Sequence, residues 1–179
     1  MRYAAFLRNV NLGRPKSPTR AQLEAAFLAG GAATAESFQV NGTLVFTAPP
    51  GARPRAIAAR ACAAMADSCG LREPVFVRSV AELRALVDAD PFAGRTVQGR
   101  DAFCITFLGA TRKPLPRLPL TTPRGDLELL STADTHVLSL SHWLGKSGGS
   151  PNAWLERHLG EPATTRNWRT IERLVARHG

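Results

Sequence analysis

Two stretches of the chain carry basic and hydroxyl side chains at spacings suited to anion binding. The first is Gly145-Lys146-Ser147, the closing triplet of a phosphate-binding P-loop. A P-loop requires Gly-x-x-x-x-Gly-Lys-Ser/Thr, because its backbone N–H groups wrap the phosphates. The position of the first glycine is Leu140, inside an apolar run, and no glycine lies between Leu140 and Gly145. The sequence therefore argues against a P-loop and against a nucleoside triphosphatase.

The same place in the chain still contains a basic side chain close to the start of a helix. Ser150 and Pro151 are typical of the N-cap and the first helical position. A flexible Gly/Ser loop carrying Lys146 is expected before them. This loop either simply starts the helix or forms a nest of N–H groups that receives an anion beside Lys146. Lys146 is therefore a candidate ligand-binding residue.

The second stretch lies near the C-terminus, where apolar residues from Trp168 onward follow helical spacing. The pattern predicts a final helix over about 165–177, with Trp168 packed beneath its exposed first turn. A cation such as Arg166 in a first turn opposes the helix dipole, so an anion or an internal carboxylate such as that of Glu161 is expected there. The candidate residues are Thr164, Thr165, Arg166 and Asn167. The basic stripe that continues along this helix is either a solvated face or part of the same surface.

A third group of polar residues is expected at one edge of the first predicted sheet. A strand that ends near Arg8 and a hairpin that turns at Asn41-Gly42 meet at this edge. Their side chains either serve the turns themselves or bind a ligand together. The candidate ligand-binding residues are Arg8, Asn11, Asn41 and Thr43.

Residues for catalysis and for metal binding are sparse. The four histidines lack metal-ligand spacing with acidic or cysteine neighbours, and neither His142 nor His158 is accompanied by a nucleophile motif. Cys62 and Cys69 lie seven apart in a predicted helix and, with Cys104, are interpreted as small buried hydrophobic residues. The sequence identifies no catalytic residue, and we predict no metal and no cofactor.

The elements that position these residues begin with the order strand, helix, strand, strand, helix, strand. Thr19 and Gln22 form a capping-box pattern, and Asn41-Gly42 between two β-rich runs is a strong hairpin signal. Pro54 and Gly70 are typical of the start and the end of the second helix. This order is ferredoxin-like, an α+β arrangement with helices packed on one face of an antiparallel sheet.

A related layout follows from about residue 96. A strand at 101–109 leads into a proline-rich connection at 111–123, which allows at most a short irregular helix. A hairpin around Ala133-Asp134 and two helices complete the chain. The sequence therefore predicts two ferredoxin-like α+β subdomains, residues 1–95 and residues 96–179.

Three stretches of the chain resemble a bacterial family called domain of unknown function 1697. Residues 6–14, FLRNVNLGR, are similar to the family's Leu-Leu-Arg-Gly-Ile-Asn-Val-Gly-Gly. Residues 37–46, SFQVNGTLVF, are similar to its Thr-Tyr-Ile-Gln-Ser-Gly-Asn-Val-Val-Phe. Residues 163–174, ATTRNWRTIERL, are similar to its closing Ala-Thr-Thr-Arg-Asn-Trp-Arg-Thr. The resemblance implies two ferredoxin-like subdomains and supplies no activity. The chain departs from the family at Asn9, Arg14, Val40, Asn41 and Thr43, so a site that uses those positions is altered here.

The charge and the apolar content of the chain indicate which partners and which location to expect. The formal charge of +9 favours polyanions as partners, although the basic residues are mostly arginines scattered through the chain, as a GC-rich genome would also produce. No apolar run is long enough to span a membrane, and the first ten residues do not form a signal peptide, so a cytoplasmic protein is expected. The favoured function is a non-catalytic module that binds nucleic acid or a phosphate-bearing ligand. The alternative is a small-molecule enzyme with its site between the subdomains, using Arg8, Asn11 and Arg166.

Overall fold

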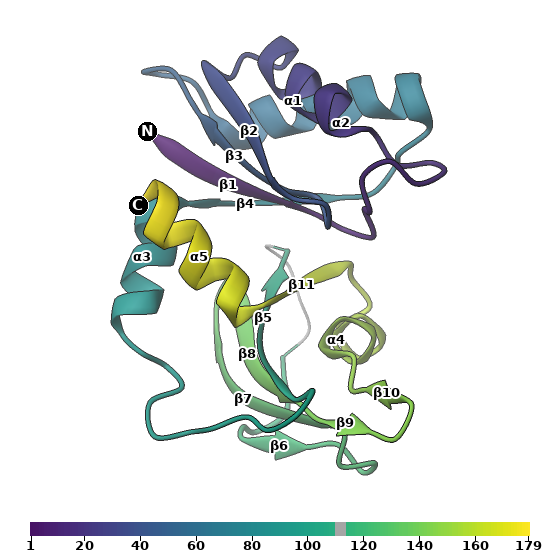
Figure 1. Ribbon diagram of the computed structural model, residues 1–179, viewed down its shortest axis with the longest axis vertical. Coiled ribbons are helices and arrows are strands. Elements are labelled where there is room, and N and C mark those ends of the chain that lie inside the picture. Colours follow the sequence, from purple (N-terminus) through teal and green to yellow (C-terminus); the bar gives the residue numbers. More distant parts are fainter. Residues whose placement is uncertain (110–113) are drawn as a thin grey trace. The chain divides into compact units, whose positions relative to one another are not determined.

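The computed structural model describes residues 1–109 and 114–179, which form two compact units (Figure 1). Unit 1 comprises Met1–Leu86 and Leu174–Gly179, and unit 2 comprises Val87–Arg173. Both combine helices with antiparallel sheets, so the predicted α+β class is confirmed. In the described part of the chain, no helix has the length and apolarity needed to cross a membrane.

Unit 1 has a four-stranded sheet in the order β2-β3-β1-β4, with antiparallel neighbours throughout. Its elements are β1 (Arg2–Leu7), α1 (Arg20–Ala29), β2 (Thr34–Gln39), β3 (Thr43–Thr47), α2 (Pro54–Cys69), β4 (Val75–Ser79) and the start of α3 (Val80–Asp88). Helices α1 and α2 lie side by side over one face of the sheet (Figure 1). Between helices and sheet, a core contains Leu7, Phe27, Phe46, Ile57 and Met65.

The helix ends of unit 1 follow the local sequence signals. Thr19 and Gln22 form the predicted capping box, with each side chain bonded to the backbone N–H of the other residue. Gly70 ends α2 in the left-handed conformation, at a φ of 74°. The Ser79 and Glu82 side chains bond in the same reciprocal way at the start of α3. The predicted capping box of α1 and the predicted end of α2 at Gly70 are confirmed.

The last residues of the chain pack on unit 1. The end of α5 (Trp168–His178) places Arg177 in an ion pair with Glu36, and the Arg2 guanidinium donates to the carbonyl of His178 at 3.1 Å. The His178 ring also meets Phe38 edge-on, with a centroid distance of 5.9 Å. Residues 174–179 therefore group with the first unit, although they are the last in the sequence. The division into subdomains 1–95 and 96–179 stays a prediction.

Unit 2 has a five-stranded antiparallel sheet in the order β11-β5-β8-β7-β6. The elements are β5 (Ala102–Leu108), β6 (Leu120–Thr121), β7 (Leu127–Ala133), β8 (His136–Ser141), the short pair β9 (Trp143–Leu144) and β10 (Ser147–Gly148), α4 (Pro151–Leu159), β11 (Ala163–Asn167) and the start of α5. The proline-rich connection forms no helix over residues 114–123, and its residues 111–113 lie outside the described part. The ferredoxin-like description of the two units stays a prediction.

The start of the final helix was predicted wrongly. Residues 163–167 form β11, which pairs with β5 in register from Ala163 opposite Leu108 to Asn167 opposite Cys104, and α5 begins at Trp168. Pairing with β5 gives the N–H and C=O groups of this segment partners in a sheet. The sequence Thr-Thr inside it is well suited to a strand, because β-branched side chains pack well on a pleated surface.

Candidate functional site

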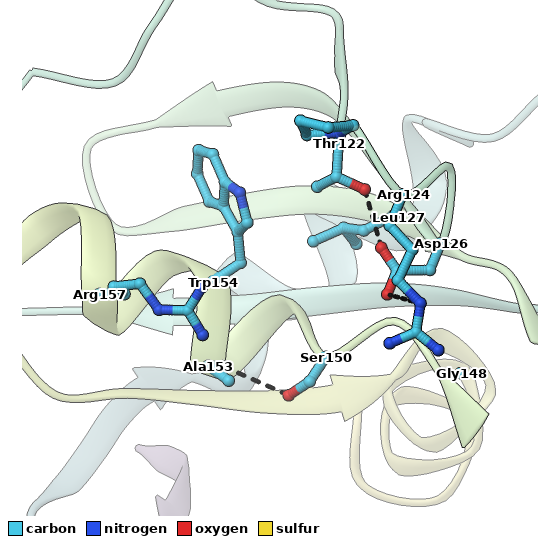
Figure 2. Close-up of a pocket in the computed structure, with 10 residues that line it drawn as sticks. Thr122, Arg124, Asp126, Leu127, Gly148, Ser150, Ala153, Trp154 and Arg157 are labelled. Carbon is cyan, nitrogen blue, oxygen red and sulfur yellow. Dashed lines mark hydrogen bonds and ion pairs between the residues drawn. The ribbon is translucent and has the colours of Figure 1, made fainter. Parts of the chain in front are cut away.

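A pocket of about 420 Å³ lies within unit 2 (Figure 2). It is bordered by α4, by β10 and by the turn between β6 and β7. The lining residues are Thr122, Pro123, Arg124, Asp126, Leu127, Gly148, Ser150, Ala153, Trp154 and Arg157. This volume falls in the range of small-molecule pockets, which starts at about 300 Å³.

One wall of the pocket is a single face of α4. Ser150, Ala153, Trp154 and Arg157 are spaced by three and four residues, and therefore line up on one side of the helix. Ser150 is the N-cap and accepts a hydrogen bond from the Ala153 N–H at 3.3 Å, and Pro151 occupies the first turn, as predicted. N–H groups at a helix start carry partial positive charge, so this wall favours a negative group.

The opposite wall is the turn that joins β6 to β7. The Thr122 N–H donates to the Leu127 carbonyl at 2.9 Å, and the Thr122 hydroxyl donates to Asp126 Oδ1 at 2.8 Å. The other oxygen of Asp126 lies 3.6 Å from Arg124 Nε. The Arg124 side chain remains 63% exposed, so this loose ion pair orients its guanidinium while leaving donors available to a ligand.

Trp154 and Arg157 give the pocket an aromatic surface and a second cation. Figure 2 shows both side chains extending from α4, while Arg124 comes from the β6–β7 turn. Trp154 is half-buried against the apolar cluster around Leu127 and Leu155, and its indole stacks on the His158 ring at 5.1 Å. Arg157 is exposed and has no hydrogen-bond or ion-pair partner among the described residues.

The two walls are held together by a close backbone approach. A Cβ atom at Gly149 would overlap the carbonyl group of Asp126, so only glycine fits at this position. The Gly149 N–H donates to the His142 carbonyl at 3.1 Å, and its own carbonyl accepts from the Ser141 hydroxyl at 2.6 Å. The segment before α4 is thereby fixed against the sheet.

Lys146 lies on a different feature from the one predicted. Residues 143–148 form a β-hairpin, in which β9 and β10 pair on either side of Gly145 and Lys146, in place of a flexible loop. Gly145 has a φ of 68°, which suits a tight turn, and the Trp143 indole N–H donates to its carbonyl at 2.9 Å. Lys146 is exposed at the hairpin tip and does not line the pocket, whereas Ser150 and the α4 start do.

The four candidates near the C-terminus are separated by the alternation of β11. Thr164 and Arg166 are buried, Thr165 is half-buried and Asn167 is exposed. The predicted exposed helix start is therefore wrong, since Arg166 is only 5% exposed and belongs to a strand. Its guanidinium donates to the Thr164 hydroxyl and to the Thr165 carbonyl, both at 2.9 Å. Burial lowers the pKa of Arg166 to about 10, which still leaves it charged at neutral pH.

The candidates of unit 1 do lie on neighbouring segments. After β1 the chain passes the β2–β3 turn, where the Leu12 N–H donates to the Val40 carbonyl at 2.7 Å. Several of the candidate side chains already interact with neighbouring residues of unit 1. Arg8 forms an ion pair with Glu73 at 2.6 Å, the buried Thr43 donates to Asn41 Oδ1 at 2.8 Å, and Asn11 is exposed. A shared ligand for Arg8, Asn11, Asn41 and Thr43 stays a prediction.

Sequence reasoning missed a network around His142. Its Nδ1 lies 2.8 Å from Asp101 Oδ2 and its Nε2 lies 2.7 Å from Glu128 Oε1. Hydrogen bonding, first to Asp101 and then to Glu128, raises the pKa of His142. The pairing of β5 with β8 is the feature that could have indicated this network. Ala102 is opposite Ser141, which places the residues just outside these strands side by side.

The three cysteines fit the interpretation as small hydrophobic residues. Cys104 is buried, and Cys62 and Cys69 are half-buried. Burial raises the pKa of Cys62 to about 11 and that of Cys104 to about 12, so these two thiols are protonated at neutral pH. Among residues 1–109 and 114–179, no group of three or more His, Cys, Asp or Glu is arranged to hold a metal ion.

Comparison with known proteins places the chain in a family. Residues 1–137 match the model of a family described as "Protein of unknown function (DUF1697)". The match covers more than half of the 179 residues, and the chain belongs to this family. It ends inside β8, so α4 and the stretch at 163–174 lie beyond the matched residues. No curated protein and no solved structure matches the chain.

Proposed function

We propose that this DUF1697 protein is a binding module for a small phosphate-bearing molecule, held in the pocket between α4 and the β6–β7 turn. The observation that carries the proposal is the pair of guanidiniums, Arg124 and Arg157, which come from the two walls of one pocket. Guanidinium groups form strong, charge-assisted hydrogen bonds to phosphate oxygens.

The charge balance of the pocket supports an anionic ligand. Arg124 and Arg157 contribute two positive charges against one negative charge from Asp126. The Ser150-capped start of α4 adds the partial positive charge of its first turn, on the helix face that carries Arg157 in its last turn. Arg157 has no partner to give up among the described residues, so a phosphate can pair with it without breaking an ion pair.

The rest of the lining indicates what the phosphate is attached to. Trp154 presents an aromatic surface, and its indole N–H has no acceptor among the described residues. Pro123 and Leu127 add apolar surface on the other wall. A phosphomonoester with a planar or apolar portion, such as a mononucleotide, suits this combination. A single hollow of about 420 Å³ favours such a molecule over the extended backbone of a nucleic acid.

Binding is favoured over catalysis because the polar groups of this pocket have structural tasks. The Ser150 hydroxyl caps α4, and Asp126 is bonded to Thr122 and Arg124. Neither forms a nucleophile–base pair. The enzyme alternative, which uses Arg8, Asn11 and Arg166, has no comparable observation in its favour.

Calorimetric titration with adenosine 5′-monophosphate and with adenosine tests the proposal. The nucleotide should bind and the nucleoside should bind much more weakly. Arg157→Ala and Arg124→Ala should each weaken nucleotide binding about tenfold or more, because each loses a charged hydrogen bond. Arg53→Ala removes the same charge from an exposed residue of unit 1 whose side chain makes no capping bond, and should leave binding unchanged.

A third arm distinguishes the source of the phosphate. A mixed-sequence single-stranded oligonucleotide is titrated at about 50 mM and about 200 mM salt. If the oligonucleotide binds far more tightly than the mononucleotide and loses that affinity steeply with salt, the ligand is nucleic acid and the small-molecule proposal is wrong. Equal binding of adenosine and its monophosphate would also overturn it.

A further inference from the structure

We infer that a second pocket in unit 2 binds a small zwitterion, an α-amino acid with an apolar side chain. This pocket also has a volume of about 420 Å³ and is bordered by residues 95–103 and by the start of α5. It differs from the first pocket in its charges. Arg95 and Arg169 line it together with Asp101 and Glu172, so both signs are present in equal number.

The positive groups of the pocket suit a carboxylate. Arg169 is exposed in the first turn of α5 and has no ion-pair partner among the described residues. The Asn167 side chain caps this turn by accepting from the Arg169 N–H at 3.0 Å, and the first turn contains no acidic residue. Arg95 is tied only loosely, at 3.9 Å, to Glu128. An incoming carboxylate therefore meets two guanidiniums with donors to spare.

The negative groups differ in whether they are already engaged. Both oxygens of Asp101 accept hydrogen bonds, Oδ1 from the Trp143 N–H and Oδ2 from His142, each at 2.8 Å. Glu172 lies one turn along α5 from Arg169, is exposed, and has no partner among the described residues. Glu172 is therefore the acceptor for the ammonium group of the ligand. Side chains three residues apart on a helix are neighbours, so Glu172 and Arg169 suit the short separation of the two charges in an α-amino acid.

Two aromatic residues, Phe103 and Trp168, line the pocket. Phe103 lines it and stacks on Phe92 at a centroid distance of 4.3 Å, and Trp168 meets Phe92 edge-on at 5.2 Å. Phe103 and Trp168 give the pocket apolar surface beside its charged residues. This arrangement matches a ligand with charged groups at one end and a hydrocarbon side chain at the other.

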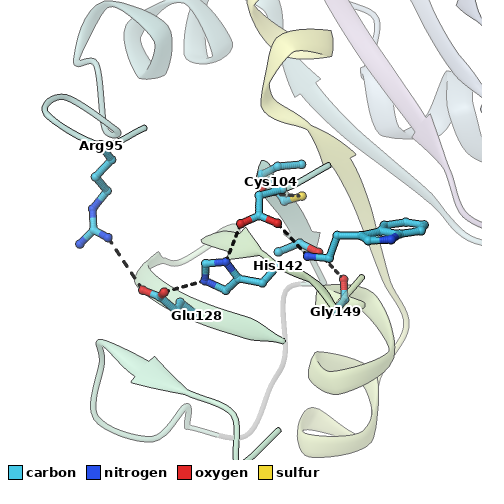
Figure 3. A network of polar contacts seen from close by, with 9 residues as sticks. Arg95, Cys104, Glu128, His142 and Gly149 are labelled. Carbon is cyan, nitrogen blue, oxygen red and sulfur yellow. Dashed lines mark hydrogen bonds and ion pairs between the residues drawn. The ribbon is translucent and has the colours of Figure 1, made fainter. Parts of the chain in front are cut away.

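The wall opposite α5 is held in place before any ligand arrives. Figure 3 shows His142 bonded to Glu128, with Arg95 reaching the same carboxylate from the other side. His142 also bonds Asp101, and the Trp143 N–H donates to the same carboxylate, so this wall is anchored to the sheet at its Asp101 end. A wall that is already ordered loses little conformational freedom on binding.

The test uses the full chain and three matched probes: L-leucine, 3-methylbutylamine, which lacks the carboxylate, and 4-methylpentanoate, which lacks the ammonium. Only leucine should bind measurably in a calorimetric or NMR titration. Glu172→Gln and Arg169→Gln should each weaken leucine binding about tenfold or more, since each removes a charged hydrogen bond. Because both side chains are exposed, the variants should keep the melting temperature of the parent.

Arg157→Ala serves as the control from the other pocket and should leave leucine binding unchanged. Absence of leucine binding, equal binding of all three probes, or full binding by Glu172→Gln would overturn the inference. None of these outcomes bears on the phosphate pocket, which the nucleotide titration tests separately.

Discussion

His142 Nδ1 lies 2.8 Å from Asp101 Oδ2, and the two residues follow and precede paired strands, β8 and β5. The second ring nitrogen faces another carboxylate, that of Glu128 on β7. A neutral imidazole carries one N–H and can donate to only one of these carboxylates. Both hydrogen bonds are therefore made only by the imidazolium, and this cation links three segments of unit 2.

The stability of the protein should accordingly depend on pH through His142. Its pKa in the folded chain is raised, by hydrogen bonding to Asp101 first and Glu128 second. A raised folded pKa means that the stabilisation is fully present below the ordinary histidine value of about 6.5 and is lost as the pH rises through the folded value. The pKa of Asp101 is lowered, mainly by the Trp143 N–H and next by His142, so its contribution is lost only as the pH falls through that lowered value.

Urea unfolding of the parent and of His142→Asn, from about pH 5 to about pH 9, measures this effect. The difference in unfolding free energy should be largest at the acidic end and should shrink as the pH rises. NMR titration of the His142 ring should give a pKa above the ordinary value. A difference that grows with pH would show that the ring acts as a neutral group.

Replacement of Arg166 should destabilise unit 2. The side chain is 5% exposed and bonded within β11, so Arg166→Ala removes the hydrogen bonds that its guanidinium donates to the Thr165 carbonyl and the Thr164 hydroxyl. The expected loss of unfolding free energy is about 1–3 kcal/mol. Arg169→Ala, three residues further on and exposed, should change it by less than about 0.5 kcal/mol. If the two substitutions have equal effects in urea unfolding, Arg166 has no structural role.

Trp168→Ala should be the more damaging change in the same region. Trp168 is 5% exposed and packs edge-on against Phe92. Removal of a large aromatic side chain from a core costs about 3–5 kcal/mol. Urea unfolding should therefore rank Trp168→Ala above Arg166→Ala, and the reverse order would contradict this account of the packing.

The β2–β3 turn should not accept a side chain at Gly42. Its φ is 73°, and a Cβ atom there would lie 2.8 Å from the Val10 Cβ. Gly51 has nearly the same φ, 76°, and no atom lies within 4 Å of its Cβ position. Gly51→Ala therefore measures the cost of a positive φ for alanine without any steric contact. Gly51→Ala should destabilise by more than about 0.4–1 kcal/mol, and Gly42→Ala by clearly more than that. Equal melting temperatures for the two variants would show that contact with Val10 is unimportant.

The parts of the fold that were predictable from the sequence are those fixed by local chemistry. Thr19 with Gln22, Asn41-Gly42 and Ser150-Pro151 each set a cap or a turn through bonds to residues close in sequence. We predicted that the final helix begins at about residue 165, whereas residues 163–167 form β11. Their strand conformation depends on pairing with β5, far away in the sequence.

The candidate site likewise combines residues that a local pattern places together with a residue that only the tertiary structure brings to them. The spacing of Ser150, Trp154 and Arg157 on one helix face is visible in the sequence, although we singled out only Ser150 and Lys146. Arg124 joins them because the β6–β7 turn packs against the segment before α4 through the Gly149–Asp126 approach. No local pattern indicates that approach. A site formed by the β6–β7 turn and α4 can therefore be recognised only from the three-dimensional structure.

The most direct test of the central claim is a ¹H–¹⁵N NMR titration of the full chain with adenosine 5′-monophosphate. We predict that the shifted signals are the Trp154 indole N–H and the backbone N–H groups at the start of α4, around Ala153. The same titration with adenosine, or with Arg157→Ala, should leave these signals nearly unmoved. Shifts that are confined to residues outside this pocket, or that adenosine reproduces in full, would contradict the assignment of the pocket as a phosphate site.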